Sequence, residues 1–324
     1  MQKTGRMRVV NGKPIVVVGS INMDLVVRAE HIPAGGETIL GSGFAMHPGG
    51  KGANQAVAVA RLGWPVEMIG MLGRCGEEVD STGAEVRAHM MRAGVGMDGV
   101  GLARATSGVA LITVAESGEN SIVVAQGANA HLSPEWIERQ ARRLQGAAMV
   151  LVQLEIPLET VMRVAEICAA ARVPLMLDPA PARELPAQLF PLVTWMTPNE
   201  TEASFYAGAA MRGDPGSVAA MLQGRGVAAA VVKMGTRGAW LADAEGYAAH
   251  VEPFAVKAVD STAAGDAFNA AFAVALAEGR SPVAAARFAT VAAAISVTRA
   301  GAQESMATRE EVQSLMAERG SVAG

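Results

Sequence analysis

The chain has 324 residues, of which 51% are apolar and 18% charged, and its formal net charge is −4. This mild negative charge argues against a nucleic-acid surface or a membrane-seeking face, because both need clusters of basic residues. Cys75 and Cys168 are too few and too isolated for a disulfide framework or a metal knot, so both are predicted to be core thiols. Residues 1–14 lack a signal-peptide pattern and no apolar run reaches membrane-spanning length, so we expect a cytoplasmic protein.

The N-terminal part of the chain predicts a buried strand that leads to two polar residues. Ile15-Val-Val-Val-Gly19 is β-branched, as is typical of a strand buried in a parallel sheet. Asn22 and Asp24 follow at its carboxyl end, where open α/β sheets bind ligands. Their alternation lets both side chains point the same way and bind sugar hydroxyls, although a capped turn is the simpler explanation of these residues alone.

Two further segments predict a small sheet outside the main fold. Residues 25–45 are strand-like and broken by Pro33-Ala-Gly-Gly36, and residues 107–115 and 120–125 predict a hairpin. Together they would build a four-stranded lid. Because an exposed sheet face or edge is commonly covered by a second chain, we expect a homodimer.

The segment Gly49-Gly50-Lys51-Gly52 opens a predicted helix over residues 53–62. Its glycines allow backbone to approach a ligand closely, and Asn54 in the first turn can donate to a sugar oxygen. The segment does not match the G-x-x-x-x-G-K-[ST] pattern, so alone it is weak evidence for phosphate binding.

Strands and helices alternate along the rest of the chain, which predicts a doubly wound parallel sheet with helices on both faces. The predicted strands cover residues 66–70, 149–154, 175–177, 195–196 and 228–232, and residues 239–242 follow a hairpin turn. The predicted helices cover residues 79–93, 158–171, 267–277, 283–298 and 308–318, and residues 73–76 predict a turn.

Polar residues follow several of these strands on the expected ligand side. Glu155 and Asp178 each end a strand, and for Asp178 a strand-end cap is an equally good explanation. Asn199 and Glu202 stand at i, i+3 on one helix face, where two oxygens can hold magnesium through its water shell. The same spacing encodes a capping box, and both readings are compatible.

The most informative stretch is Asp260-Ser-Thr-Ala-Ala-Gly-Asp266-Ala-Phe-Asn269. A polar turn leads directly into an apolar helix, so several N–H groups at the helix start converge on one spot that favours an anion. Asp266 would hold its carboxylate beside that spot. A proton acceptor next to donors for a phosphoryl group is what alcohol phosphorylation needs, although an ordinary capped helix fits this stretch alone equally well.

Taken together, these motifs resemble the ribokinase family of sugar kinases, the PfkB type. The matching segments are, in chain order, Gly49-Gly-Lys-Gly-Ala-Asn-Gln55, Gln153-Leu-Glu155, Asp178-Pro-Ala-Pro-Ala-Arg183, Thr197-Pro-Asn-Glu-Thr-Glu202, the Asp260 stretch and Gly301-Ala-Gln303. The resemblance covers about residues 15 to 310. It implies an α/β kinase core over residues 15–24, 49–105 and 128–320, a β lid over 25–48 and 106–127, and an N-terminal extension over 1–14.

The resemblance implies ATP-dependent phosphorylation of ribose at its primary hydroxyl, with Asp266 as the base. By the same resemblance the Ala263, Ala264 and Gly265 amides stabilise the transferring group. The implied sugar contacts are Asn22, Asp24, Gly50, Lys51, Gly52, Asn54, Glu155 and Asp266. The implied nucleotide contacts are Asn199, Lys233, Gly235, Thr236, Arg237, Gly238, Gly265 and Thr290. Asn199 and Glu202 would hold Mg²⁺ through water, and the implied K⁺ site comprises Asp260, Thr262, Ser296, Arg299, Gly301 and Ser305.

Two rival functions remain open from the sequence. The first is the same phosphoryl transfer to 2-deoxyribose, fructose, a ketodeoxy sugar acid or a nucleoside, although a sugar acid needs a positioned cation and a nucleoside needs aromatic stacking. The second is a non-catalytic sugar-binding protein on a kinase scaffold, against which the intact Gly265-Asp266 pair argues. Glu304 departs from the family, which carries proline there, and this affects the expected loop detail.

Overall fold

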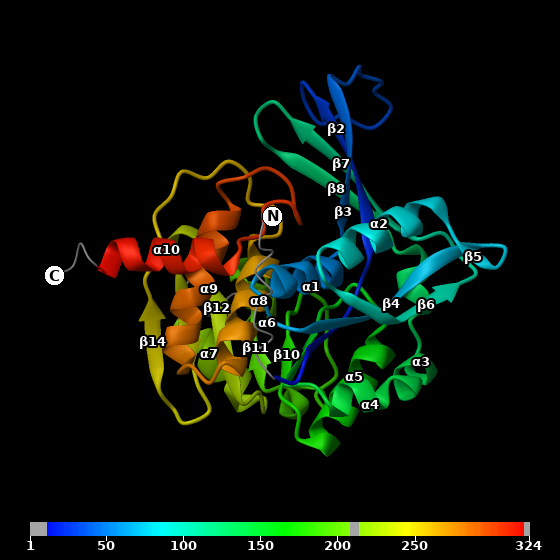
Figure 1. The fold of residues 1–324 in the computed structure, drawn as a ribbon. Coiled ribbons are helices and arrows are strands. Elements are labelled where there is room, and N and C mark those ends of the chain that lie inside the picture. The colour runs from blue at the N-terminus through cyan, green and yellow to red at the C-terminus, as the bar shows by residue number, and fades with distance from the viewer. Residues whose placement is uncertain (1–11, 208–213, 321–324) are drawn as a thin grey trace, which may run out of the picture.

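The computed structural model describes residues 12–207 and 214–320. These residues form a layered α/β body with a separate small sheet that projects from one side of it (Figure 1). The predicted N-terminal extension, residues 1–14, lies outside the described residues except for residues 12–14. Among the residues that the structure describes, no helix combines the length and apolar character needed to cross a bilayer.

The main sheet has ten strands within the described residues, and its central strands are parallel. The strands from one edge to the other are β14 (Ala248–Val251), β13 (Ala239–Ala242), β12 (Ala229–Lys233), β11 (Trp195–Met196), β10 (Leu175–Leu177), β9 (Met149–Val152), β1 (Ile15–Val18), β4 (Val66–Cys75) and β5 (Glu78–Val79), with β6 (Gly96–Ala103) also paired to β4. Of these pairs, only β12 with β13, β13 with β14 and β4 with β5 are antiparallel. The expected doubly wound, mostly parallel fold is confirmed.

Alternation along the strands divides the core into two layers. In β1, Ile15 and Val17 point into one apolar cluster and Val16 and Val18 point into the other. The helices of the first layer are α1 (Lys51–Arg61), α2 (Ser81–Arg92), α8 (Ala264–Ala277), α9 (Pro282–Ser296) and α10 (Arg309–Gly320). The helices of the second layer are α3 (Pro134–Arg139), α4 (Ala141–Gln145), α5 (Leu158–Ala171), α6 (Glu200–Ala207) and α7 (Pro215–Gly224).

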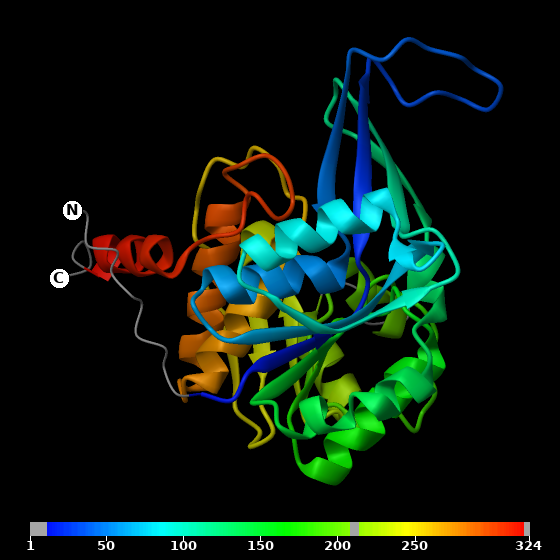
Figure 2. The same ribbon diagram turned by 45° about the vertical axis from the view of Figure 1, so that its right-hand side comes forward.

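The second sheet is the expected four-stranded lid. Its strand order is β3 (Gly43–Gly49), β2 (Asn22–Ala29), β7 (Gly108–Ala115) and β8 (Asn120–Ala125). Strands β7 and β8 form the predicted hairpin. Figure 2 shows the lid extending away from the layered body, so its far end contacts little of the core in this state.

The structure corrects the predicted boundaries near the lid. Strand β2 begins at Asn22 and not at residue 25, so Asn22 and Asp24 lie on the first lid strand. Both are extended, as their alternation indicated, and the capped turn is not formed. The predicted turn over residues 73–76 is wrong for residues 73–75, because β4 continues through Cys75, and the turn begins at Gly76. It continues because β6, which the sequence did not indicate, pairs with it as far as Gly73, and β5 pairs with Arg74 and Cys75.

Strand β6 was missed because glycines interrupt its apolar pattern. A Cβ atom at Gly101 would lie 2.7 Å from the Trp136 ring, and one at Gly99 would lie 2.6 Å from the Met68 carbonyl. Tertiary packing therefore requires glycines in a strand that local propensity disfavours. Cys75 is also corrected, since it is exposed, whereas Cys168 is buried as expected.

Candidate active site

The start of helix α8 has the backbone of an anion site. Ala263, just before the helix, has a left-handed backbone with φ 58° and ψ 13°. This conformation costs a non-glycine residue about 1–2 kcal/mol. Strained residues of this kind cluster at functional sites, although Arg172 adopts the same conformation as an ordinary cap at the end of α5. The Ala264 amide donates to the Ser261 carbonyl at 3.3 Å, which is a long bond. First-turn amides have no acceptors within their own helix, so this turn can offer donors to an anion.

Asp266 is buried at this helix start, with only 4% of its surface exposed. Asn54 Nδ2 donates to its Oδ2 at 3.1 Å, and Gln55 Nε2 donates to its Oδ1 at 3.0 Å. Burial raises the pKa of Asp266 from the ordinary 3.8 to about 6, with the Lys51 charge lowering it and the Asp178 charge raising it. Such a carboxylate is ionised near neutral pH and is still basic enough to accept a proton.

Asn22 and Asp24 both lie on β2 and are buried. The Asn129 amide holds Asn22 in place, because its Nδ2 donates to Asn22 Oδ1 at 2.7 Å. A Cβ atom at Gly49 would lie 2.2 Å from the Asp24 carboxylate, so only glycine leaves room for that carboxylate. The pKa of Asp24 is raised to about 7, mainly by burial. The charges of Glu155 and Asp266 contribute to this rise, and the charge of His47 opposes it.

Glycines also bring the Lys51 loop close to β1 and β2. Gly50 has φ 88°, and a Cβ atom on Gly52 would lie 2.7 Å from the Gly19 carbonyl carbon. Gly50 and Gly52 therefore permit a backbone approach that other residues would block.

Glu155 and Lys51 complete the group of residues that are expected to contact the sugar. Glu155 Oε2 accepts from the Ser20 hydroxyl at 2.5 Å and from the Lys51 amide at 3.3 Å. Burial lowers the pKa of the Lys51 side chain, but the carboxylates of Asp266, Asp178 and Glu155 raise it by more, so the pKa is raised overall. Lys51 therefore stays charged amid carboxylates.

The residues that are expected to contact the nucleotide meet the same cluster through Lys233. Its Nζ lies 3.0 Å from Asp178 Oδ1, and a Cβ atom at Gly265 would lie 3.4 Å from Nζ. The ammonium group is thus next to the α8 start, where a phosphate would bind. Gly235, Thr236 and Arg237 form the short helix η4 (Gly235–Arg237), and Gly238 follows with φ 81°.

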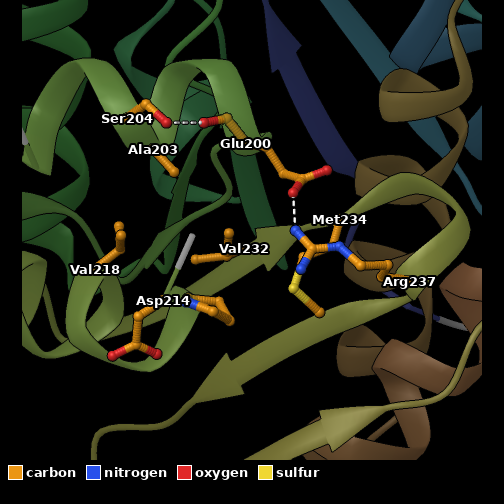
Figure 3. A pocket seen from close by; sticks show the side chains of 9 residues that line it. Glu200, Ala203, Ser204, Asp214, Val218, Val232, Met234 and Arg237 are labelled. Atoms are coloured by element: carbon orange, nitrogen blue, oxygen red, sulfur yellow. Dashed lines mark hydrogen bonds and ion pairs between the residues drawn. The ribbon is translucent and has the colours of Figure 1, made fainter. Parts of the chain in front are cut away.

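Two expected nucleotide residues have other partners in this state. Arg237 pairs with Glu200, and the two lie above a pocket of about 60 Å³ between α6, α7 and η4 (Figure 3). That volume holds a few water molecules, and Asp266 is not among the residues that line it. Thr290 lies on α9, where its hydroxyl donates to the Ala286 carbonyl at 2.9 Å.

Asn199 and Glu202 form a reciprocal cap at the start of α6. The backbone N–H of Asn199 donates to Glu202 Oε2 at 2.7 Å, and the backbone N–H of Glu202 donates to Asn199 Oδ1 at 2.9 Å. Burial raises the pKa of Glu202, while the Lys233 charge lowers it. Within residues 12–207 and 214–320, no three His, Cys, Asp or Glu side chains are arranged to hold a metal. The donor set fits magnesium held through water and substrate phosphates better than a cage of protein ligands.

The loops before α8 and after α9 meet at Asp260. Its Oδ1 accepts from the Thr262 amide at 2.9 Å and its Oδ2 accepts from the Gly301 amide at 3.0 Å. Three other residues of the expected K⁺ set have separate side-chain partners. Arg299 pairs with Glu311, and the buried Ser296 and Ser305 hydroxyls donate to the carbonyls of Ala293 and Ala302. Glu304 lies 3.5 Å from His47 of the lid, which ties this loop to β3.

The comparisons with known proteins agree with this geometry. A family model for pfkB family carbohydrate kinases matches residues 13–309. The chain belongs to this family. It is 43% identical over 303 residues to the ribokinase of Bacillus subtilis (strain 168), covering 93% of this chain and 99% of that protein. It is 36% identical over 307 residues to the deoxyribokinase of Salmonella typhi, covering 92% and 96%. The solved structure of Arabidopsis thaliana ribokinase complexed with ribose and ATP matches with a TM-score of 0.84 at 33% identity, covering 94% of this chain and 99% of that one.

Sequence reasoning did not assign the buried amides that hold this carbohydrate kinase's acidic residues. Gln55, Asn129, Gln153 and Gln303 are all buried, and each one donates to a side chain of the cluster or to its neighbour. For Gln55, Gln153 and Gln303 the available signal was their position inside the matched motifs. Asp178, left open between cap and function, lies between Gln55 and Lys233.

Proposed function

We propose that the protein transfers the γ-phosphoryl group of ATP to the primary hydroxyl (O5) of D-ribose, giving ADP and ribose 5-phosphate. The observation that carries the proposal is the Asp266 carboxylate, buried at the helix start and held by Asn54 and Gln55. The similarity to ribokinases, one of them solved with ribose and ATP, supports the choice of both substrates.

In the proposed reaction Asp266 accepts the proton of the ribose hydroxyl as that oxygen attacks the γ-phosphorus. The bond between this phosphorus and the bridging oxygen of ADP breaks. The Ala263, Ala264 and Gly265 amides then donate to the transferring group, where negative charge is spread over three oxygens. Lys233, which lies beside Gly265, adds a positive charge at the same place.

The sugar is bound by residues that surround Asp266. Asn22, Asp24, Asn54 and Glu155 supply carbonyl, amide and carboxylate groups for hydroxyls, and Gly50, Lys51 and Gly52 bring backbone close. Residues 25–48 and 106–127 are proposed to act as a lid that excludes water, a competing phosphoryl acceptor.

Two metal ions belong to this proposal. Magnesium, arranged through Asn199 and Glu202 by way of water, would neutralise phosphate charge. Potassium would bind at the loops joined by Asp260, with backbone carbonyls as further ligands.

The lid also supports a proposed homodimer. The strand register aligns Met46, Leu25, Leu111 and Val123 in one row on the sheet face opposite to Asp24. Phe44 on the same face is 64% exposed and Val123 is 63% exposed. Leu25 packs partly against the core, whereas the other side chains of the row are exposed. Exposed apolar side chains gathered on one face are typical of a surface covered by another chain, and the two-fold pairing of identical lids would cover them.

A coupled assay of ADP release tests the function with ribose, 2-deoxyribose, fructose and a nucleoside as acceptors. We expect the highest kcat/KM with ribose. A higher kcat/KM with 2-deoxyribose would instead assign the acceptor of the deoxyribokinase relative. Sugar binding without ADP release for any acceptor would favour a non-catalytic sugar-binding protein.

A further inference from the structure

Gln55 contacts two acidic side chains with a single amide group. It is 1% exposed, and its Nε2 lies 3.0 Å from Asp266 Oδ1 and 3.1 Å from Asp178 Oδ2. Its Oε1 accepts from Gln153 Nε2 at 2.7 Å. These partners determine the amide orientation, because a flipped amide would point its oxygen at two carboxylates and its NH₂ at another donor.

The contacts of Gln55 connect the two substrate sides of the site. Asp178 pairs with Lys233 through its other oxygen, so hydrogen bonds and one ion pair run from Asp266 through Gln55 and Asp178 to Lys233. Lys233 begins the nucleotide loop and Asp266 lies at the sugar. A shift of either loop would therefore change the geometry at the carboxylate that accepts the proton.

We propose that Gln55 is a positioning residue for phosphoryl transfer, which orients the Asp266 carboxylate, keeps it ionised and links it to Lys233. This inference rests on the proposed function, in which Asp266 is the base. A hydrogen bond donated to an ionised carboxylate stabilises that form, and it is stronger than a bond between neutral groups. Without it the buried carboxylate would bind a proton at higher pH and would be a base in a smaller fraction of molecules.

Other charged groups also face Asp266, and they set the size of the expected effect. Lys51 on α1 opposes its protonation, and Asp178 after β10 and Asp24 on β2 favour it. Lys233 lies next to Gly265 at the start of the same helix. All of these charges remain in a Gln55 variant, so a change in the pH profile would report the lost donor.

The test is the pH dependence of kcat/KM between pH 5 and pH 9 for wild type and Gln55→Met. Loss of one charge-assisted bond is expected to move the midpoint of the acid limb from about pH 6 to about pH 7 or higher. With a midpoint at about pH 7 the activity deficit would be roughly fivefold at pH 6, would approach tenfold at about pH 5 and would shrink above pH 8. A deficit that is equal at every pH, with an unmoved midpoint, would overturn the inference.

Two further variants guard against a folding defect. Gln55→Glu keeps the shape and replaces the donor by a third carboxyl group, so it should raise the midpoint as well. In Gln55→Met the buried Gln153 Nε2 loses the Gln55 oxygen that accepts its hydrogen bond. The double variant Gln55→Met with Gln153→Met removes this unpaired donor as well, and it should give the pH profile of the single variant. If Gln55→Met does not fold, the pH profile of Gln55→Glu is the test, and an unmoved midpoint in that variant would overturn the inference.

The matched control is Gln303→Met. Gln303 is fully buried and its Nε2 donates at 3.2 Å to Asn54 Oδ1, so it supports the other Asp266 donor without touching a carboxylate. We expect a smaller shift of the acid limb than in Gln55→Met, because Asn54 itself keeps its bond to Asp266. An equal shift would assign the Gln55 effect to packing. Asp266→Asn separates the two proposals. Activity in that variant would refute the base itself, whereas an inactive variant with an unchanged Gln55→Met profile would refute only the role of Gln55.

Discussion

Replacing Asp266 by asparagine should remove most of the activity and, at neutral pH, relieve electrostatic strain in the folded protein. The carboxylate is buried and its pKa is raised from 3.8 to about 6, mainly by that burial. Asparagine keeps the shape and one oxygen for the amide donors, but it neither ionises nor accepts the proton. Positioned proton transfer contributes roughly 10²–10⁴ in rate, so kcat should fall by at least about 100-fold.

The stability effect has a definite sign. Because the folded pKa lies above the unfolded one, the folded protein holds a proton on Asp266 more readily than the unfolded chain does. The stability linked to this proton is fully present below about pH 4 and is lost as the pH rises through about 6. A shift of roughly two units, at about 1.4 kcal/mol per unit, corresponds to about 3 kcal/mol. Asparagine does not titrate, so the variant should not lose this contribution.

Denaturant unfolding at several pH values between 4 and 8 measures the effect as a difference between variant and wild type. The free energy of unfolding of Asp266→Asn minus that of wild type should rise by about 3 kcal/mol across this range. An imperfect fit of the amide to its donors would add a constant cost of about 1–3 kcal/mol without changing the slope. A flat difference would refute the burial argument, and a kcat near that of wild type would remove Asp266 from the base role.

Four other perturbations follow from the structure. Phe272→Ala, at a fully buried ring, should lower the free energy of unfolding by about 3–5 kcal/mol, and a loss below 1 kcal/mol would mean that the site collapses without a cavity. Val123→Lys on the lid should convert a dimer to a monomer in sedimentation measurements, and a monomeric wild type would contradict the proposed interface. Gly49→Ala should push the Asp24 carboxylate aside and raise KM for the sugar more than it lowers kcat, so an unchanged KM would argue against Asp24 as a sugar contact. Activity should be higher in K⁺ than in Na⁺ at equal ionic strength, and Asp260→Asn should abolish this difference; equal wild-type rates would argue against the cation site.

The elements that local pattern predicted best are those buried on both faces or on one continuous stripe. Strands β10, β11 and β13 and helix α5 have the predicted bounds, because short apolar runs between turn residues and an amphipathic helix leave little choice of register. The start of α8 lies three residues earlier than expected, at Ala264, because Ala263 adopts the left-handed turn that the sequence does not reveal. Strand β6 depends on close packing against Trp136 and β4, which is a tertiary cause.

The motifs predicted which residues gather at the site better than they predicted how these residues are held. Asn54 and Asp266 were both expected there, and the structure joins them by a hydrogen bond. The expected magnesium pair, Asn199 and Glu202, also forms the capping box that the same spacing allowed. For such short patterns structure and function use the same groups, so sequence spacing alone cannot separate the two roles.

The convergence of Asn54 and Gln55 on one carboxylate illustrates the limit of local reasoning. Adjacent residues of a helix point about 100° apart, so their spacing gives no reason to expect a common partner. They share Asp266 because α8 begins beside α1, with the carboxylate between the two directions. Buried amides from distant segments, Gln153 and Gln303, then hold the two donors from behind. A base whose ionised form is disfavoured by burial needs such support on both oxygens, and only the packing of α1 against α8 provides it.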